Sequence, residues 1–413
     1  KTFSYSNHAD DRKMKNYDII KAFCRRIFII GSGDYWYEDG GIGDDGNIFY
    51  KLYSGSLYTI YFVMTLLETL AAIFGNFPED EQRDSAALAV SHSIVLIKIF
   101  FIIRNKKFVV ALNKTMVKIC EEYEEPTMMA RKYTILKINV IAYFASVYTS
   151  VSCFVLQGLN KYFHGSHFVT VVTYYPTFED DSPLATSFRI IWTFGLIGLM
   201  MTMIVSVDGV TVAHLVMYKY KFITLRQYFE KVRKDFLKLN KTDPRLAAEK
   251  LSKGLVEGII MHKELINLAL EFDKAFGTVI ALQLFLSSGT AVSLLLQMLA
   301  LHNLPLLIFL KIIFFVAALF LLLAVFLCNA GEITYQASLI DESLFYCGWH
   351  ECVTLPPPHR DVRKLVLLGC VQAQRPLVMM AFKMVHLSYG SFIQVISSGG
   401  LSSLKTLLRW LLT

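Results

Sequence analysis

Seven long apolar stretches divide this chain of 413 residues, and each is long enough to cross a lipid bilayer as a helix. A bilayer core of about 30 Å requires about 20 apolar residues in helical form. Apolar residues make up 54% of the chain and charged residues only 18%, a balance that a water-soluble domain of this length could not bury. The sequence therefore predicts an all-α polytopic membrane protein with seven transmembrane helices, at residues 48–74, 85–103, 133–157, 188–217, 275–299, 306–328 and 377–412.

The positive charges gather on one side of these stretches. When the connecting segments are assigned alternately from the N-terminus, the N-terminal segment and the even-numbered loops carry most of the 41 Lys and Arg residues. The three other loops carry only Arg83 and Lys161. Lys and Arg beside membrane helices stay in the cytoplasm, so we predict a cytosolic N-terminus and an extracellular C-terminus. The net charge of +7 then reports topology and does not indicate nucleic-acid binding.

This topology divides the chain into successive segments. Apolar residues at helical spacing, among them Phe222, Leu225 and Phe229, predict that the fourth helix continues below the membrane. The alternating sequence at 168–175 predicts a short strand or one arm of a hairpin. In chain order we expect a cytosolic N-terminal segment (1–47), transmembrane helices 1–4 (48–217) with a long extracellular loop (158–186), cytosolic helices (218–275), transmembrane helices 5 and 6 (276–328), a second cytosolic segment (329–375) and the last helix (376–413).

The charged residues within the predicted spans include Glu68, Lys98, Asp208 and Lys311. A charge at the bilayer centre is costly, and each of these residues lies toward one end of its span. We expect Lys98 to extend its ammonium group to the inner interface. A transporter would require acidic residues at mid-depth or an internal repeat, and the sequence contains neither pattern.

The cysteine pattern predicts neither disulfides nor a metal site. None of the seven cysteines lies in a predicted extracellular loop. Cys347 and Cys352, with His350 and His359 nearby, could supply part of a zinc site. No second Cys pair completes a tetrahedral set, so free thiols are the favoured interpretation. We expect no metal and no cofactor. We also expect no enzyme activity, because the sequence has no phosphate-binding glycine loop, HExxH or GxSxG motif.

The last apolar stretch, predicted as one helix over 376–412, carries a polar stripe. Its polar residues recur at steps of three and four, which places them on one helix face. A stripe of hydroxyl and amide groups can line water. Alternatively, the small residues around Gly399 and Gly400 allow close packing between helices. The stripe alone leaves both interpretations open, and its members are Ser391, Gln394, Ser398, Ser402 and Lys405.

Two short motifs lie near the C-terminus. An Arg-Pro-Leu step at 375–377 precedes the Ser-bearing stretch HLSYGSFIQ, and SLKTLLR follows at 403–409. These motifs resemble the C-terminal signature of insect odorant receptors, which ends in Ser-Tyr-Phe-Thr-Leu-Leu-Arg-like residues. The direct resemblance covers about the last fifty residues. The number of spans, the inverted orientation, the long second extracellular loop and the long cytosolic segment extend it to the rest of the chain.

The resemblance implies a specific activity. It implies an odorant-gated, non-selective cation channel subunit that assembles with an odorant co-receptor as a heterotetramer in the plasma membrane of sensory-neuron dendrites. It implies that the cytosolic segments anchor the subunits to one another and that the second half of the last helix, with its polar stripe, lines the pore. Lys405 departs from the family pattern, in which apolar or neutral residues are commoner. We favour extension of Lys405 to the outer headgroups over a position facing the pore.

The resemblance also implies that a small volatile ligand binds in the outer half of the bundle. Such a site requires aromatic and methionine walls with few polar groups. Trp192 is the strongest single candidate, because its large ring stands one turn from the small Gly195. The candidate ligand-binding residues are Ser91, His92, Ser146, Tyr148, Ser150, Phe154, Phe188, Trp192, Gly195, Leu199 and Met203.

Other receptor classes fit the sequence less well. A gustatory-receptor-type channel is the nearest alternative, but its Thr-Tyr…Gln-Phe ending is missing from the last span. A G-protein-coupled receptor would have an extracellular N-terminus, an Asp/Glu-Arg-Tyr sequence after the third span and Asn-Pro-x-x-Tyr in the seventh. The sequence has neither motif, and its charge distribution favours the opposite orientation.

Overall fold

The computed structural model describes residues 16–38, 41–75, 79–164, 182–300, 306–352, 362–381 and 385–397. Within these residues the chain is almost entirely helical, with one two-stranded hairpin. The α-helices are α1 (Asn16–Ile29), α2 (Ile48–Phe74), α3 (Glu79–Arg104), α4 (Lys106–Lys118), α5 (Pro126–Phe163), α6 (Pro183–Leu239), α7 (Pro244–Ala300), α8 (Leu306–Ser338), α9 (Ile340–Phe345), α10 (Val362–Ala373) and α11 (Tyr389–Ile396). Short 3₁₀ turns span Glu121–Tyr123 and Trp349–Cys352, and the strands are β1 (Met380–Ala381) and β2 (Val385–His386).

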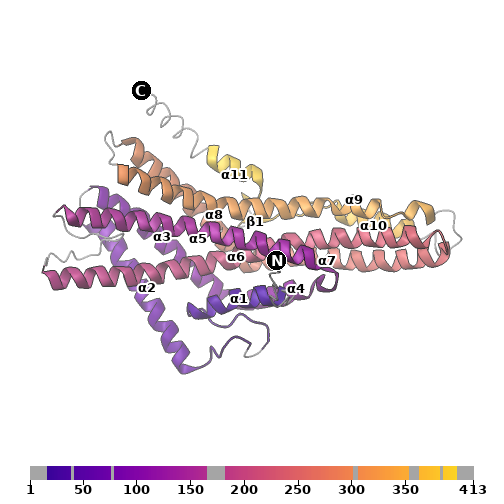
Figure 1. The fold of residues 1–413 in the computed structure, drawn as a ribbon, viewed down its shortest axis with the longest axis horizontal. Helices are drawn as coiled ribbons and strands as arrows, with labels where there is room; N and C mark the ends of the chain where they lie inside the picture. The colour runs from indigo at the N-terminus through magenta and orange to yellow at the C-terminus, as the bar shows by residue number, and fades with distance from the viewer. Residues whose placement is uncertain are drawn as a thin grey trace, which may run out of the picture.

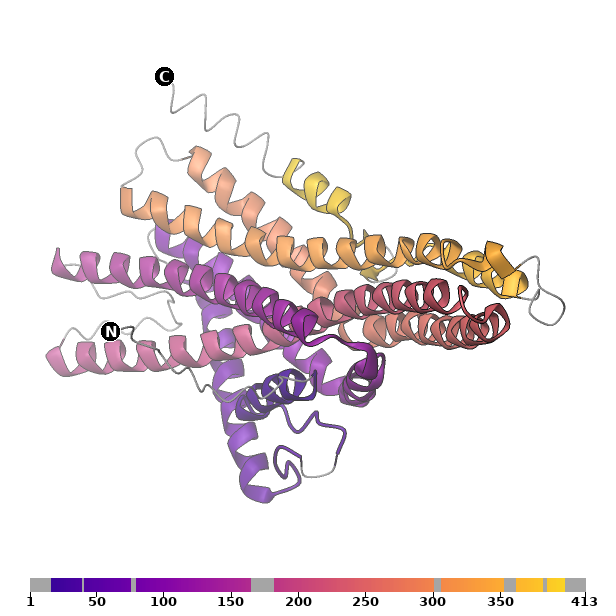
Figure 2. The ribbon, with the colours of Figure 1, turned by 45° about the vertical axis from the view of Figure 1, so that its right-hand side comes forward.

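The long helices form one bundle. Helices α5, α6, α7 and α8 run side by side along the long axis of the molecule (Figures 1 and 2), with α3 packed against α7. Helix α2 packs on α3 and leaves the bundle at an angle. The short helices α1 and α4 lie together against α6 and α7.

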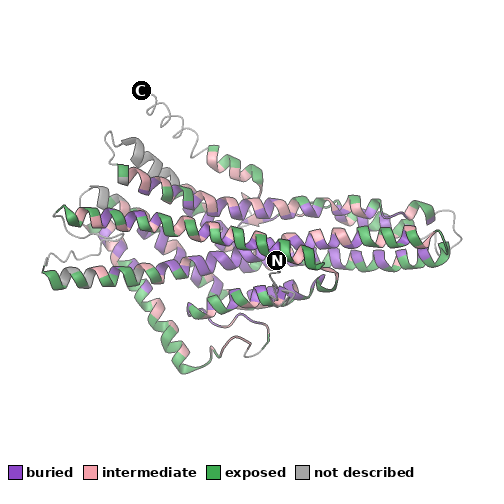
Figure 3. Ribbon diagram, in the orientation of Figure 1, coloured by how far each residue is buried: buried purple, intermediate pink, exposed green. Residues whose placement is uncertain are grey.

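Helix α6 is the centre of the bundle. Every residue from 205 to 218 is buried, so no face of this stretch is open to solvent or lipid (Figure 3). A helix that is apolar on all sides is found in the middle of a bundle. The charged exceptions in this stretch, such as Asp208, must therefore find partners on neighbouring helices.

Helices α6 and α7 each contain 57 residues. At about 1.5 Å per residue each extends about 85 Å, well beyond a bilayer core of about 30 Å. The prediction that the fourth helix continues past residue 217 is confirmed. Between the two helices, Asp243 Oδ1 accepts a hydrogen bond from the Leu246 backbone N–H at 3.1 Å, and Pro244 takes the first position of α7. Both are favourable at a helix start.

Five of the described helical stretches are long and apolar enough to cross a membrane. They correspond to the first four predicted spans and the sixth. The predicted span at 275–299 lies in α7, in which the side chains of residues 291–300 are not described, and the last span runs into residues 398–413, outside the described part of the chain. The predicted strand at 168–175 also lies outside the described residues.

The prediction of one continuous helix from Pro376 is wrong. Helix α10 ends at Ala373, and the chain then forms a β-hairpin with Met380 paired to His386 before α11 begins at Tyr389. A proline disfavours helical backbone in the residue before it, so Pro376 stops α10. The Ser388 side chain caps α11 by accepting a hydrogen bond from the Ser391 backbone N–H at 3.2 Å. Helical periodicity gave no signal of the hairpin.

A cluster of polar side chains, the Glu124 cluster (Asn16, Glu124, Lys132 and Lys221), ties α1, α5 and α6 together. The Lys132 and Lys221 ammonium groups lie 2.7 and 2.8 Å from different carboxylate oxygens of Glu124, and the Asn16 amide donates to Glu124 at 3.0 Å. Desolvation by burial has the largest influence on the pKa of Glu124 and would raise it. Lys221 and Lys132 together outweigh that effect and lower the pKa below its ordinary value.

Candidate functional site

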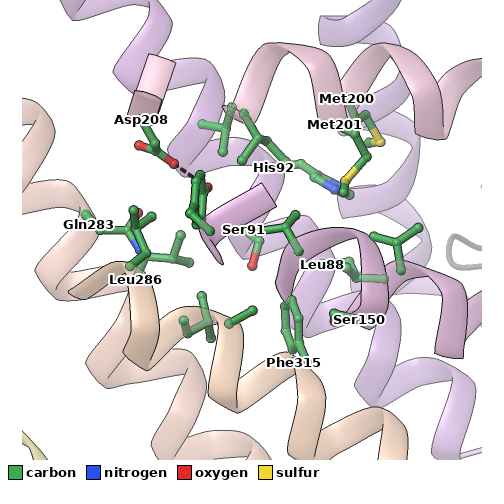
Figure 4. Close-up of a pocket in the computed structure, with 18 of the residues that line it drawn as sticks. Leu88, Ser91, His92, Ser150, Met200, Met201, Asp208, Gln283, Leu286 and Phe315 are labelled. Carbon is green, nitrogen blue, oxygen red and sulfur yellow. Dashed lines mark hydrogen bonds between the residues drawn. The ribbon is translucent and has the colours of Figure 1, made fainter. Parts of the chain in front are cut away.

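A mostly apolar cavity lies between α3, α5, α6, α7 and α8 and has a volume of about 90 Å³. Figure 4 shows its side chains converging on one space, with Asp208 and Gln283 on one side and His92, Met200 and Met201 on the other. Its apolar wall consists of Leu88, Val95, Val147, Val151, Phe154, Ile197, Met200, Met201, Ile204, Leu286, Phe315, Ala318, Leu319 and Leu322. Its polar residues are Ser91, His92, Lys98, Tyr143, Ser150, Asp208 and Gln283.

One end of the cavity is closed by what we call the floor network (Lys98, Tyr143, Asp208 and Gln283). The Lys98 ammonium lies 2.9 Å from Asp208 Oδ1, and the Tyr143 hydroxyl donates to Asp208 Oδ2 at 2.8 Å. Lys98 also donates to the Gln283 side-chain oxygen. These four residues come from four different helices. Each charged atom of the pair has a partner, which a buried ion pair requires.

The floor network overturns the expectation for Lys98. Its side chain is 1% exposed and does not extend to an interface, because Asp208 on α6 faces it across the bundle. Glu68 is likewise fully buried, with its Oε2 2.7 Å from Nδ1 of His92. Lys311 pairs with Asp84 and lies 4.9 Å from the centre of the Phe154 ring. The charges within the spans thus pair between helices, and sequence position alone did not reveal these partners.

Four of the predicted ligand-binding residues line the cavity: Ser91, His92, Ser150 and Phe154. The Ser91 hydroxyl bonds the Ala87 carbonyl of its own helix at 3.0 Å. The Ser150 hydroxyl is buried and has no hydrogen-bond partner among the described residues. The cavity therefore presents a polar side chain, Ser150, that the described residues leave unsatisfied.

The other predicted residues with described side chains do not line this cavity. Trp192 and Tyr148 are about half exposed and face away from the bundle. Trp192 was the strongest predicted candidate because of its large aromatic ring. Ser146 donates to the Tyr143 carbonyl at 2.9 Å. Met203 is fully buried in the helical core. Of the remaining candidates, Gly195 and Leu199 lie outside the lining and the Phe188 side chain is not described.

Sequence reasoning missed most of the cavity lining, including the floor network, the methionine pair and Phe315. A signal for the network was present. Tyr143 stands seven residues from Ser150, and Asp208 stands seven residues from Met201, so each pair shares one helix face. Asp208 is one of the charged residues within the spans. A search along its helix face would therefore have identified Met201 as a residue of the site.

The predicted pore stripe is described only in part. Ser391 and Gln394 lie on α11, where Ser391 is half-buried and Gln394 is exposed. The Tyr389 hydroxyl at the start of α11 donates to Glu332 on α8 at 2.7 Å, so this helix is held against α8. Ser398, Ser402 and Lys405 lie outside the described residues.

All seven cysteines are free thiols. Cys347 and Cys352 are buried, and His359, the more distant of the two neighbouring histidines, lies outside the described residues. Within the described part of the chain, no group of three His, Cys, Asp or Glu side chains comes together in a way that could hold a metal ion.

The fold is similar to that of a solved olfactory receptor. The insect olfactory receptor OR5 from Machilis hrabei matches with a TM-score of 0.70 at 13% identity, covering 95% of this chain and 99% of that one. Its complex with eugenol matches with a TM-score of 0.72 at 14% identity, covering 96% and 100%. At this identity the likeness concerns the fold.

The sequence comparison identifies the family. No curated protein sequence matches this chain significantly. The sequence profile of the 7tm odorant receptor family matches residues 83–399, which include the cavity-forming stretches of α3, α5, α6, α7 and α8. The match covers more than half of the chain, so this protein belongs to the 7tm odorant receptor family.

Proposed function

We propose that this chain is the ligand-binding subunit of an odorant-gated, non-selective cation channel in the plasma membrane. The observation that carries the proposal is the cavity within the bundle, which has methionine and aromatic walls and few polar groups. Sites for small volatile molecules have this composition. The similar receptor from Machilis hrabei was solved in complex with eugenol. Membership of the odorant receptor family adds further support.

The cavity is tighter than typical ligand pockets, which have volumes of about 300–1,000 Å³. The unbranched, flexible side chains of Met200 and Met201 form part of its wall and can adjust to an occupant. The proposed binding step therefore includes displacement of these side chains. Ser91, His92, Ser150 and Phe154 are the lining residues that we propose contact the ligand.

Pore and partner assignments complete the proposal. The subunit assembles with odorant co-receptor subunits as a heterotetramer, with anchor segments at 218–275 and 329–375 and a pore-lining segment at 376–413. Helices α6 and α7 support this assignment because they extend well beyond the length of a membrane span.

Co-expression tests the channel function. Cells that express both this chain and an odorant co-receptor should give an odorant-evoked, non-selective cation current within milliseconds of ligand application. Cells that express this chain alone should give little current. A robust current without co-receptor, or a strict requirement for G protein, would contradict the proposal.

Glycan mapping tests the orientation. The sequon at Asn113 is uninformative because that side chain is fully buried and bonds the Tyr35 carbonyl at 2.8 Å. The half-buried Asn240 should stay unmodified if its segment is cytosolic. The substitution His164→Asn creates an Asn-Gly-Ser sequon in the proposed extracellular loop and should acquire a glycan. The reverse pattern of modification would overturn the orientation.

A further inference from the structure

The cavity has polar groups at two levels. His92 lies six residues from Lys98 on α3, and Ser150 lies seven residues from Tyr143 on α5. At about 1.5 Å per residue, both stand about 9–10 Å along the bundle from the floor network. In Figure 4, His92 and Ser150 lie on the side away from Asp208. We call His92, Ser150 and the buried partner Glu68 the upper polar site.

The upper polar site has hydrogen-bonding capacity that the protein does not use. The Ser150 residue is 2% exposed, and its Oγ has no partner among the described residues. The His92 ring uses Nδ1 for its contact with Glu68 at 2.7 Å, so Nε2 takes no part in that contact. A buried polar group without a partner is costly, so such a group marks a place for a ligand atom.

The partner of His92 determines what Nε2 can offer. If Glu68 is ionised and His92 is protonated, Nε2 carries a hydrogen. If Glu68 is neutral and donates its proton to Nδ1, the neutral ring again carries its hydrogen on Nε2. Nε2 would be an acceptor only if Nδ1 carries the hydrogen and donates it to an ionised Glu68 or to the carbonyl oxygen of a neutral Glu68. The first state places an uncompensated negative charge in the bundle. The second leaves the acid hydrogen on Oε1, which has no partner among the described residues.

We propose that the cavity selects a neutral ligand with a hydrogen-bond-accepting oxygen, such as a ketone, ester or ether, which binds at the upper polar site. Nε2–H of His92 and the Ser150 hydroxyl are the donors. A charged ligand is disfavoured because Lys98 is already matched with Asp208 and His92 with Glu68, so an added charge would have no opposite charge of its own. This inference rests on the proposed function, since it concerns the ligand of the same cavity.

Ser150→Ala is the primary test because it removes an unpaired hydroxyl and leaves no new polar atom without a partner. Binding is measured on the purified full-length protein in detergent, as the ligand-induced shift in unfolding temperature over a concentration series. The probes share one skeleton: ethylbenzene, acetophenone, phenethylamine and phenylacetic acid. We expect Ser150→Ala to weaken acetophenone about tenfold more than ethylbenzene, since losing one hydrogen bond in a buried site is worth about one power of ten.

The matched control is Ser152→Ala, which changes an exposed serine on the same helix that lies outside the cavity lining. It should alter the binding of neither compound. A second variant, His92→Phe with Glu68→Leu, removes both members of the buried pair together, so neither remains without its partner. It should give the same selective loss for acetophenone.

Several results would overturn the inference: equal weakening of acetophenone and ethylbenzene, no weakening of either, binding of only the amine or the acid, or no binding by any probe. Failure of the proposed function looks different. In that case acetophenone would bind the purified protein with the expected selectivity, while cells that express this chain with the co-receptor would give no odorant-evoked current.

Discussion

Two groups of buried polar side chains differ in how completely they are paired. In the Glu124 cluster, both carboxylate oxygens and both lysine ammonium groups have partners. In the upper polar site, Ser150 Oγ and Glu68 Oε1 have none among the described residues. Both groups lie between helices of the same bundle. A fully paired group holds helices together, whereas a group with unpaired atoms can still form hydrogen bonds with another molecule.

The floor network belongs to the first kind, although it borders the cavity. Asp208 receives Lys98 on one oxygen and Tyr143 on the other, so it has little capacity for a ligand. We therefore expect substitutions in the Glu124 cluster and in the floor network to act mainly on folding. Substitutions in the upper polar site and the apolar wall should act mainly on ligand binding.

The largest expected effect follows from Glu124→Leu. This change leaves the buried Lys132 and Lys221 without a carboxylate, and breaking a buried pair in this way costs about 3–5 kcal/mol. We expect most of the expressed protein to be misfolded, measured as loss of the monodisperse peak in size-exclusion chromatography. Glu122→Leu, which changes an exposed neighbour, should leave the peak intact. A normal peak for Glu124→Leu would show that the cluster does not hold the helices.

The next effect concerns the floor network. Asp208→Leu leaves Lys98 buried without its charge partner and should destabilise the protein by about 3 kcal/mol. The double variant Lys98→Met with Asp208→Leu removes both charges and should recover most of the unfolding temperature, since well-packed apolar residues can replace a buried pair. Differential scanning fluorimetry of the three proteins tests this. If the double variant is no more stable than the single one, the pair is not the source of the loss.

A smaller and pH-dependent effect is expected for Glu124→Gln. The pKa of Glu124 is lowered in the folded protein, so the ionised carboxylate contributes stability above the ordinary Glu pKa of about 4.3. That contribution is lost as the pH falls through the lowered folded pKa. The wild type should therefore unfold at a higher temperature than the variant from neutral pH down to about pH 5, and the gap should narrow as the pH falls below the ordinary Glu pKa. A constant gap at all pH values would contradict the ion-pair explanation.

Local signals predicted where most helices lie. The first predicted span coincides with α2, where Asn47 caps the first turn by accepting from the Phe49 backbone N–H at 2.9 Å. The continuation of α6 past residue 217 followed from its spacing of apolar residues. Capping residues and apolar periodicity are properties of a short stretch of chain, so one sequence is sufficient to detect them.

The errors arose where distant residues decide the outcome. Lys98 and Asp208 are 110 residues apart, and no local pattern shows that they meet. The helix face that turns inward also depends on the neighbouring helices, so the sequence alone did not show that the Trp192 side chain is about half exposed. The hairpin after Pro376 had local signals in Pro376 and Ser388, but the apolar content of the stretch favoured a helix.

The smallest expected effect comes from comparing two substitutions on α6, one in the cavity wall and one on the outer face of the helix. Trp192 is about half exposed and does not line the cavity, whereas Met201 does. Met201→Ala should change the odorant concentration for half-maximal current about tenfold, because it removes part of the apolar wall. Trp192→Ala should change it less than about twofold, within the small effect expected of a substitution away from the site. Both are measured in cells that also express the co-receptor. A larger effect for Trp192→Ala would place the ligand outside this cavity, and the unpaired groups of the upper polar site would then need another explanation.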